Sequence, residues 1–253
     1  MALVIVTGGS TGIGAATVRK FAAEGFDVAF LDTNVRDGKT LASESHWGSL
    51  LFLETDVSSK SAVEKAVNAA VEKFGPPVAL FANAGVHRPT SIFELSEEDV
   101  NFHIDVNLKG VLYSVAAVAG FMREAKSGSI VLMSSDQAFV GKPGCLVYGA
   151  TKGAVAQMTK GLSVEFSPYG VRVNAVCPAT VRTPLTERVF QQVAEADFDG
   201  DLDAAWAAEA KAHPIGRVAE PSEIAEVVFF LSQNSSAFMT GALVPVDGGL
   251  TAQ

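Results

Sequence analysis

The chain has few cysteines, few basic residues and no long apolar run, and each shortage excludes a class of protein. Its two cysteines, Cys145 and Cys177, match no metal-ligand spacing and are too few for a disulfide framework. We therefore expect two reduced thiols and no metal site. The 19 Lys and Arg residues stand against 28 Asp and Glu, which gives a formal net charge of −9. Nucleic acids and anionic membranes need a basic surface, so neither is expected as the main partner.

No stretch approaches the run of about 18 apolar residues that a membrane span needs. The opening apolar run, residues 2–6, stops at Thr7 with no basic residue before it and is too short for the apolar part of a signal peptide. We therefore expect a cytoplasmic protein. The 253 residues, 48% of them apolar, suffice for one large α/β domain.

Short apolar strands alternate with amphipathic helices almost to the end of the chain. Strands are predicted at 3–7, 27–32, 50–56, 77–83, 129–135, 171–178 and 242–247, and helices at 12–24, 36–44, 59–74, from 97 past 110, at 146–167 and from 221. Apolar strands alternating with helices predict a parallel sheet covered on both faces. The expected fold is a doubly wound, Rossmann-like α/β sheet of about seven strands, in one domain over residues 1–253.

One segment breaks this alternation. Residues 183–213 are helical in composition and acidic, with a break at Gly200. They follow the carboxyl end of a predicted strand, where ligands bind in such sheets, so we interpret them as a substrate lid. A pair of solvated surface helices is an equal alternative for the outer face.

A glycine-rich turn, TGGSTGIG at residues 7–14, follows the first strand and opens the first helix. Gly8 permits a sharp turn, while Gly12 and Gly14 let the backbone approach a pyrophosphate and the helix pack on its strand. The N–H groups and partial positive charge of the helix N-terminus suit phosphates. The pattern in this context predicts a dinucleotide site.

Asp32 ends the second strand, 18 residues after Gly14. A carboxylate there can accept hydrogen bonds from a ribose 2′-hydroxyl and would repel a 2′-phosphate. Ser10 and Thr11 leave the turn without a cation, and Arg36 is interpreted as the exposed start of a helix. NAD is therefore favoured over NADP, although Asp32 as a simple turn former remains an alternative.

Tyr148 and Lys152 are four residues apart and share a face of the predicted helix 146–167. A nearby ammonium group stabilises phenolate, so we expect Lys152 to lower the pKa of Tyr148. Such a phenolate can take the proton of an alcohol while hydride leaves the carbon. The pair alone is a common surface feature, and its meaning depends on the turn upstream.

In this context the chain closely resembles the short-chain dehydrogenase/reductase family over essentially all of its length. The resemblance is carried by six motifs in order: TGGSTGIG at 7–14, Asp56-Val57, Ala82-Asn83-Ala84-Gly85, Val106-Asn107, Ser135 with Tyr148-Gly-Ala-Thr-Lys152, and Cys177-Pro178-Ala179 through Thr183. Ala82 and Ala179 depart from the asparagine and glycine frequent in the family. Alanine is small enough to keep both turns, so we expect no loss of activity.

The resemblance implies roles for particular residues. Tyr148 is the general acid/base, Lys152 tunes it and binds the nicotinamide ribose, Ser135 binds the substrate oxygen, and Asn107 holds a water in a relay to Lys152. The residues implied to bind the cofactor are Gly8, Thr11, Gly12, Ile13, Gly14, Asp32, Asp56, Val57, Asn83, Ala84, Gly85, Tyr148, Lys152, Pro178, Val181 and Thr183. The family also suggests a homotetramer.

Positions that the family uses for substrate contact carry polar groups: His87, Arg88, Asp136, Gln137 and Arg182. We single out His87, Gln137 and Arg182 as candidate substrate residues, although each could equally face solvent or another subunit. The predicted function is an NAD-dependent oxidoreductase that interconverts a secondary alcohol and a ketone on a small polar substrate such as a sugar, polyol or cyclic alcohol. Alternatives are an NADPH-dependent carbonyl or 3-oxoacyl reductase, and a dinucleotide-binding scaffold without chemistry.

Overall fold

The computed structural model describes residues 1–44 and 48–253, which leaves His46, to which no role was assigned, outside the described residues. Within them, seven strands form one parallel sheet with the order β3-β2-β1-β4-β5-β6-β7. The strands are β1 Leu3–Thr7, β2 Asp27–Asp32, β3 Leu50–Glu54, β4 Pro77–Ala82, β5 Gly128–Met133, β6 Val171–Pro178 and β7 Leu243–Val246. The predicted doubly wound α/β fold is confirmed.

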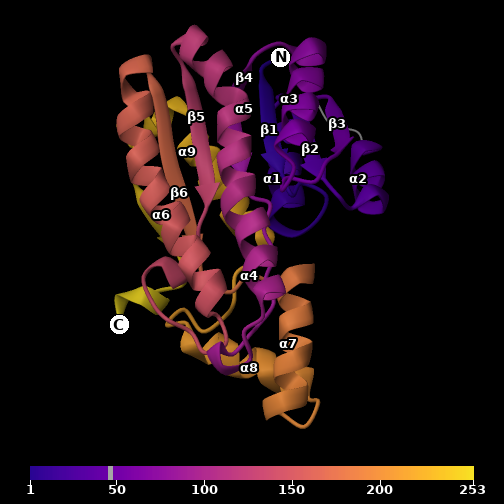
Figure 1. Ribbon diagram of the computed structural model, residues 1–253, viewed down its shortest axis with the longest axis vertical. Helices are drawn as coiled ribbons and strands as arrows, with labels where there is room; N and C mark the ends of the chain where they lie inside the picture. The colour runs from indigo at the N-terminus through magenta and orange to yellow at the C-terminus, as the bar shows by residue number, and fades with distance from the viewer. Residues whose placement is uncertain (45–47) are drawn as a thin grey trace.

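Helices cover both faces of the sheet (Figure 1). They are α1 Gly12–Ala23, α2 Val35–Ala42, α3 Lys60–Phe74, α4 Glu97–His103, α5 Gly110–Ala125, α6 Leu146–Phe166, α7 Pro184–Asp197, α8 Leu202–Ala212 and α9 Pro221–Ser232. Successive residues of a strand point to opposite faces. Leu3 and Ile5 of β1 therefore join the core beneath α3, α5 and α6, while Val4 and Val6 join the core beneath α1, α2 and α9.

The helical segment Glu97–Ala125 is continuous but not uniform. α4 and α5 are joined by a π-helical stretch, Ile104–Lys109, which the sequence pattern did not predict. By length and composition alone the segment could cross a membrane. In α5, however, Val111, Val118 and Met122 are buried in the core against the sheet, so their apolar character serves packing in this fold.

The segment interpreted as a lid forms two helices, α7 and α8, which project from one end of the sheet (Figure 1). They are held together by Phe190 and Trp206, whose rings stack with centroids 4.1 Å apart. A hydrogen bond from Thr180, just after β6, to Glu209 of α8 ties the pair to the body of the protein. Asp199 and Gly200 both adopt positive φ at the break between the helices.

The strand order reverses between β1 and β4, which are neighbours although two strands separate them in the chain. In open α/β sheets, the carboxyl ends of the strands at such a reversal form the ligand crevice. Thr7 ends β1 and Ala82 ends β4, and the two residues are paired in register. The glycine-rich turn and the Asn83-Ala84-Gly85 segment therefore meet at one crevice.

Candidate active site

The glycine-rich turn is shaped by contacts that allow no side chain. A Cβ at Gly14 would lie 1.9 Å from the carbonyl oxygen of Gly8, and one at Gly8, which has φ of +64°, would lie 2.8 Å from Cα of Ala84. Thr11, the N-cap of α1, makes no side-chain cap hydrogen bond. The first N–H groups of α1 therefore stay available for phosphate oxygens.

Asn83 ties the turn to the end of β4. Its amide Nδ2 donates to the carbonyl oxygens of Thr7 at 3.0 Å and Gly8 at 2.9 Å. In return, the Thr7 hydroxyl oxygen accepts hydrogen bonds from the backbone N–H groups of Asn83 and Ala84, both at 3.1 Å. The two strand ends are thus locked at the crevice by side chains that the sequence motif supplied.

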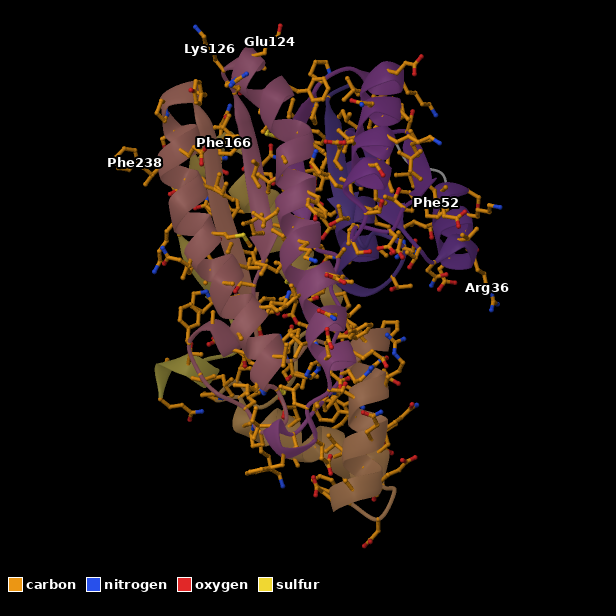
Figure 2. The ribbon with its side chains drawn as sticks, viewed as in Figure 1. Arg36, Phe52, Glu124, Lys126, Phe166 and Phe238 are labelled. Atoms are coloured by element: carbon orange, nitrogen blue, oxygen red, sulfur yellow. The ribbon has the colours of Figure 1, made fainter. Side chains whose placement is uncertain are left out.

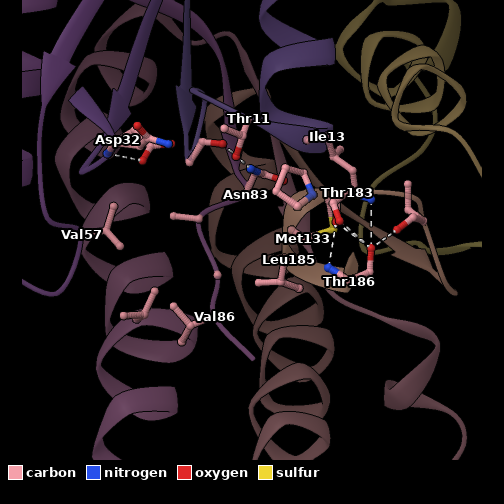
Figure 3. A pocket seen from close by; sticks show the side chains of 18 of the residues that line it. Thr11, Ile13, Asp32, Val57, Asn83, Val86, Met133, Thr183, Leu185 and Thr186 are labelled. Carbon is pink, nitrogen blue, oxygen red and sulfur yellow. Dashed lines mark hydrogen bonds between the residues drawn. The ribbon is translucent and has the colours of Figure 1, made fainter. Parts of the chain in front are cut away.

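A cavity of about 540 Å³ runs along this crevice (Figure 3). The size suits a ligand of the dinucleotide class. Its lining contains every residue predicted to bind the cofactor except Gly14, which lies beneath the turn. Of the four predicted catalytic residues, Ser135, Tyr148 and Lys152 line the cavity and Asn107 is fully buried behind it.

Asp32 marks one end of the cavity. Its carboxylate accepts hydrogen bonds from the backbone N–H of Ser10 and of Asn34, each 2.9 Å long. Asp37 and Asp56 also line this end, so three carboxylates surround it. Arg36 is exposed and points away from the body of the protein (Figure 2). Asp37 was not among the predicted site residues, although it lies in the first turn of the helix that follows Asp32.

Lys152 marks the other end of the cavity. Its side chain is 2% exposed, and its ammonium group donates a 2.9 Å hydrogen bond to the carbonyl oxygen of Met133. Burial lowers the pKa of Lys152 to about 8. The ammonium nitrogen lies 5.5 Å from the centroid of the Tyr148 ring, as the shared helix face predicted.

Tyr148 does not show the predicted fall in pKa. Burial raises the pKa of its phenol, the neighbouring Ser135 hydroxyl acts in the opposite direction, and the charge of Asp136 adds to the rise. The prediction that Lys152 lowers this pKa is therefore wrong for the protein's own groups. Burial of the phenol, and not the charge of Lys152, determines the direction of this pKa.

Ser135 and Ser134 have different partners. The Ser134 hydroxyl donates to the carbonyl oxygen of Lys152 at 2.9 Å, which fixes it within the structure. The Ser135 hydroxyl donates to a carboxylate oxygen of Asp136 at 2.7 Å, and its oxygen accepts from the backbone N–H of Gln137 at 3.2 Å. Ser135, the residue that the motif spacing selected, is the one beside Tyr148.

Asn107 lies in the π-helical stretch and is 0% exposed. Its side-chain amide pairs with the backbone of Val86, accepting from the N–H at 2.8 Å and donating to the carbonyl at 2.9 Å. A Cβ at Gly85 would lie 3.3 Å from Asn107 Oδ1 and 3.6 Å from Lys152 Nζ. The small space over Gly85 is therefore bounded by both polar groups, which is where the implied water relay would run.

His87 packs against the catalytic tyrosine. Its ring centroid lies 4.4 Å from that of Tyr148, and its Nε2 has no hydrogen-bond partner among the described residues. Burial lowers the pKa of His87 to about 4, with the nearby His103 and Lys152 acting in the same direction. His87 is therefore neutral at pH 7 and can offer either a donor or an acceptor.

None of the three candidate substrate residues, His87, Gln137 and Arg182, lines the cavity. Gln137 lies beside Cys145 at the start of α6, where its side chain contacts the thiol. Arg182 is exposed, and its guanidinium lies 4.5 Å from the ring centroid of Trp206. Arg188 of α7, which was not predicted as a site residue, lines the cavity. The predicted lid, residues 183–213, includes Arg188, whereas Arg182 lies just before it.

Together, the phosphate-binding turn, the acidic ribose end and the Tyr148–Lys152–Ser135 group define a nicotinamide-dependent oxidoreductase. The family model described as "Enoyl-(Acyl carrier protein) reductase" matches residues 8–251. The chain belongs to the short-chain dehydrogenase/reductase family, as its motifs indicated.

Similar proteins and similar solved structures match nearly the whole chain. Oxidoreductase UcpA of Salmonella typhimurium is 38% identical over 251 residues, which are 98% of this chain and 93% of that protein. The structure of levodione reductase is 29% identical, with a TM-score of 0.93 over 99% of this chain and 98% of that one. Aldohexose dehydrogenase of Thermoplasma acidophilum is 31% identical, with a TM-score of 0.90 over 100% and 94%.

Proposed function

We propose that the protein is an NAD-dependent oxidoreductase that interconverts a secondary alcohol and a ketone on a small, polar, hydroxylated substrate. The observation that carries the proposal is a single cavity with three carboxylates at one end and the Tyr148–Lys152–Ser135 group at the other. A dinucleotide with a free 2′-hydroxyl fits the first end and places its nicotinamide at the second.

Lys152 and Tyr148 have different roles at the second end of the cavity. Lys152 supplies a fixed positive charge and donors for ribose hydroxyls, and Tyr148 holds the proton that is exchanged with the substrate oxygen. When bound, the nicotinamide supplies the hydride acceptor and, oxidised, a positive charge that lowers the pKa of the nearby phenol. Asn107 and Gly85 shape the space beside Lys152 through which water would return the proton.

The polar substrate is supported by His87 beside Tyr148. The Nε2 nitrogen of His87 is buried and has no hydrogen-bond partner among the described residues, which favours a ligand that carries a hydrogen-bonding group of its own beside Tyr148. The similarity to an aldohexose dehydrogenase, 31% identical, agrees with this chemistry. The alternative, an NADPH-dependent carbonyl or 3-oxoacyl reductase, is supported by the acyl-carrier-protein description of the family model. The net charge of −9 weighs against an acidic carrier protein as partner.

A substrate panel tests the proposal. Sugars, polyols, cyclic alcohols and their ketones are assayed with NAD, NADP and their reduced forms, together with a 3-oxoacyl thioester. We expect NADH formation with at least one hydroxylated alcohol. Turnover confined to NADPH and the thioester would establish the alternative, and cofactor binding without turnover of any compound would indicate the scaffold.

We also propose a cytoplasmic homotetramer. The outer face of α6 carries exposed Leu146 and Val164, 55% and 76% exposed, with the small Gly161 between them. Phe238, 104% exposed, points away from the molecule (Figure 2). Exposed apolar side chains of this size favour contact with another subunit. Light scattering in solution should give four times the 26.4 kDa mass of the chain.

A further inference from the structure

Asp136 is a buried carboxylate whose position next to Ser135 is not explained by cofactor binding. It is 2% exposed, although a buried carboxylate is costly unless it is paired. One oxygen accepts the Ser135 hydroxyl proton at 2.7 Å, and the other lies 2.8 Å from the ammonium group of Lys142, whose side chain is 29% exposed. The three side chains form a chain from the cavity wall to the surface.

The interaction with Asp136 determines whether the Ser135 hydroxyl can donate or accept a hydrogen bond toward the cavity. A serine hydroxyl has one proton and two lone pairs, and an ionised carboxylate only accepts. The proton of Ser135 is therefore held by Asp136, and one lone pair accepts from the N–H of Gln137. What remains is a lone pair on the side of Tyr148, whose phenol is also hydrogen-bonded to Ser135, and this lone pair suits the O–H of an alcohol rather than the oxygen of a ketone.

We propose that Asp136 is a positioning residue that acts through Ser135 as a second proton acceptor for the alcohol, parallel to Tyr148. The hydride leaves the carbinol carbon with its electron pair and is accepted by the oxidised nicotinamide of the proposed function. The alcohol O–H bond breaks at the same time, and its proton passes to Ser135 Oγ. The original Ser135 proton moves to Asp136 Oδ1, and the carbon–oxygen double bond forms. After the ketone leaves, the proton returns to water through the same two groups.

The charged groups around Asp136 agree with this role. Lys142 faces it from the loop before α6 and compensates its charge. Tyr148 and Cys145 at the start of α6 and Cys177 of β6 have their pKa values raised, first by burial and also by the Asp136 charge. Asp136 accepts the hydrogen bond of the Ser135 hydroxyl, and the Tyr148 phenol is also hydrogen-bonded to that hydroxyl.

The test rests on the proposed function and uses the panel alcohol that the wild-type enzyme oxidises fastest. Oxidation is measured from pH 6 to pH 9 in Tyr148→Phe, Tyr148→Phe/Asp136→Asn and Tyr148→Phe/Ser135→Ala. We expect Tyr148→Phe to keep a residual rate that is flat with pH. Both double variants should fall at least tenfold below it. Tyr148→Phe/Asp247→Asn is the matched control. Asp247 also accepts a hydrogen bond from a hydroxyl group, that of Thr251, but it lies outside the cavity lining.

The NADH dissociation constant and the melting temperature of each variant show whether it is folded. If Asp136→Asn disturbs the fold, the Tyr148→Phe/Ser135→Ala double variant still tests the relay. Equal residual rates in Tyr148→Phe and its double variants would overturn the relay, as would a residual rate that rises tenfold with each pH unit. A wild-type enzyme that oxidises no alcohol would instead overturn the proposed function, and the relay with it.

Discussion

The ammonium group of Lys152 donates a 2.9 Å hydrogen bond to the carbonyl oxygen of Met133, the last residue of β5. This bond anchors a buried cation of α6 to the carboxyl edge of the sheet, directly beneath the crevice. It explains why a charge can lie there with 2% exposure. Because of this bond, the position of the Lys152 ammonium group is set by the sheet and not by Tyr148.

The first prediction follows from the pKa of Lys152, which burial lowers from 10.5 to about 8. Between those values the unfolded chain binds more protons than the folded one, so stability rises with pH. The full effect is on the order of 3 kcal/mol. In urea unfolding without cofactor, the wild-type free energy relative to Lys152→Met should therefore increase between pH 7.5 and pH 10. A difference that does not change with pH would contradict it.

The second prediction concerns Asp32. Its carboxylate lies at the ribose end with Asp37 and Asp56, so a 2′-phosphate would meet like charges there. The wild-type enzyme should bind NADH roughly 100-fold more tightly than NADPH, and Asp32→Asn should reduce this ratio at least about tenfold. Fluorescence titration with both cofactors measures it. Tighter binding of NADPH by the wild type would refute the assignment to NAD.

The third prediction concerns the turn. In Gly14→Ala, the new Cβ would be 1.9 Å from the Gly8 carbonyl oxygen, so the turn has to move. We expect a loss of about 1–3 kcal/mol in stability and much weaker NADH binding. Gly120→Ala is the control, because its Cβ meets no described atom within 4 Å on helix α5. The stability of Gly120→Ala should increase by up to about 1 kcal/mol. Normal NADH affinity in Gly14→Ala would contradict the role of the glycine-rich turn in cofactor binding.

Much of the fold was predictable because its signals are local. The apolar strands, Gly25 after α1 and the Pro168-Gly170 end of α6 each follow from a few adjacent residues, and β2 agrees with its predicted bounds at both ends. The π-helical turn at 104–109 was not predictable. It depends on Asn107 pairing with the backbone of Val86, 21 residues earlier in the chain, which no helical periodicity records.

The site shows the same contrast between features predicted from local motifs and features set by long-range contacts. The cofactor residues came from ordered motifs, and all but Gly14 line the cavity. The direction of the Tyr148 pKa was missed because desolvation depends on the packing around the ring, which includes His87 from another element. Arg182 was expected at the substrate because of its place before the lid. Its side chain stacks on Trp206 of α8, a contact set by how the lid folds back.

The fourth prediction compares two of the candidate substrate residues. Neither residue lines the cavity, but the ring centroid of His87 lies 4.4 Å from that of Tyr148, whereas Arg182 contacts Trp206. His87→Ala should raise KM for the best panel alcohol about tenfold or more, the usual cost of one or two lost hydrogen bonds. Arg182→Ala should change KM less than about twofold. Steady-state kinetics at saturating NAD decides, and the reverse order of effects would exclude His87 as a substrate contact.

The proposed reaction depends on Tyr148 as the group that exchanges a proton with the substrate. The most direct measurement is kcat/KM of Tyr148→Phe for alcohol oxidation, with the NADH dissociation constant determined on the same preparation. We predict a fall of about 10²–10⁴-fold in kcat/KM, as general acid–base catalysis contributes, and a dissociation constant within about twofold of wild type. A Tyr148→Phe enzyme that binds NADH normally and turns over at the wild-type rate would contradict the assignment of this site.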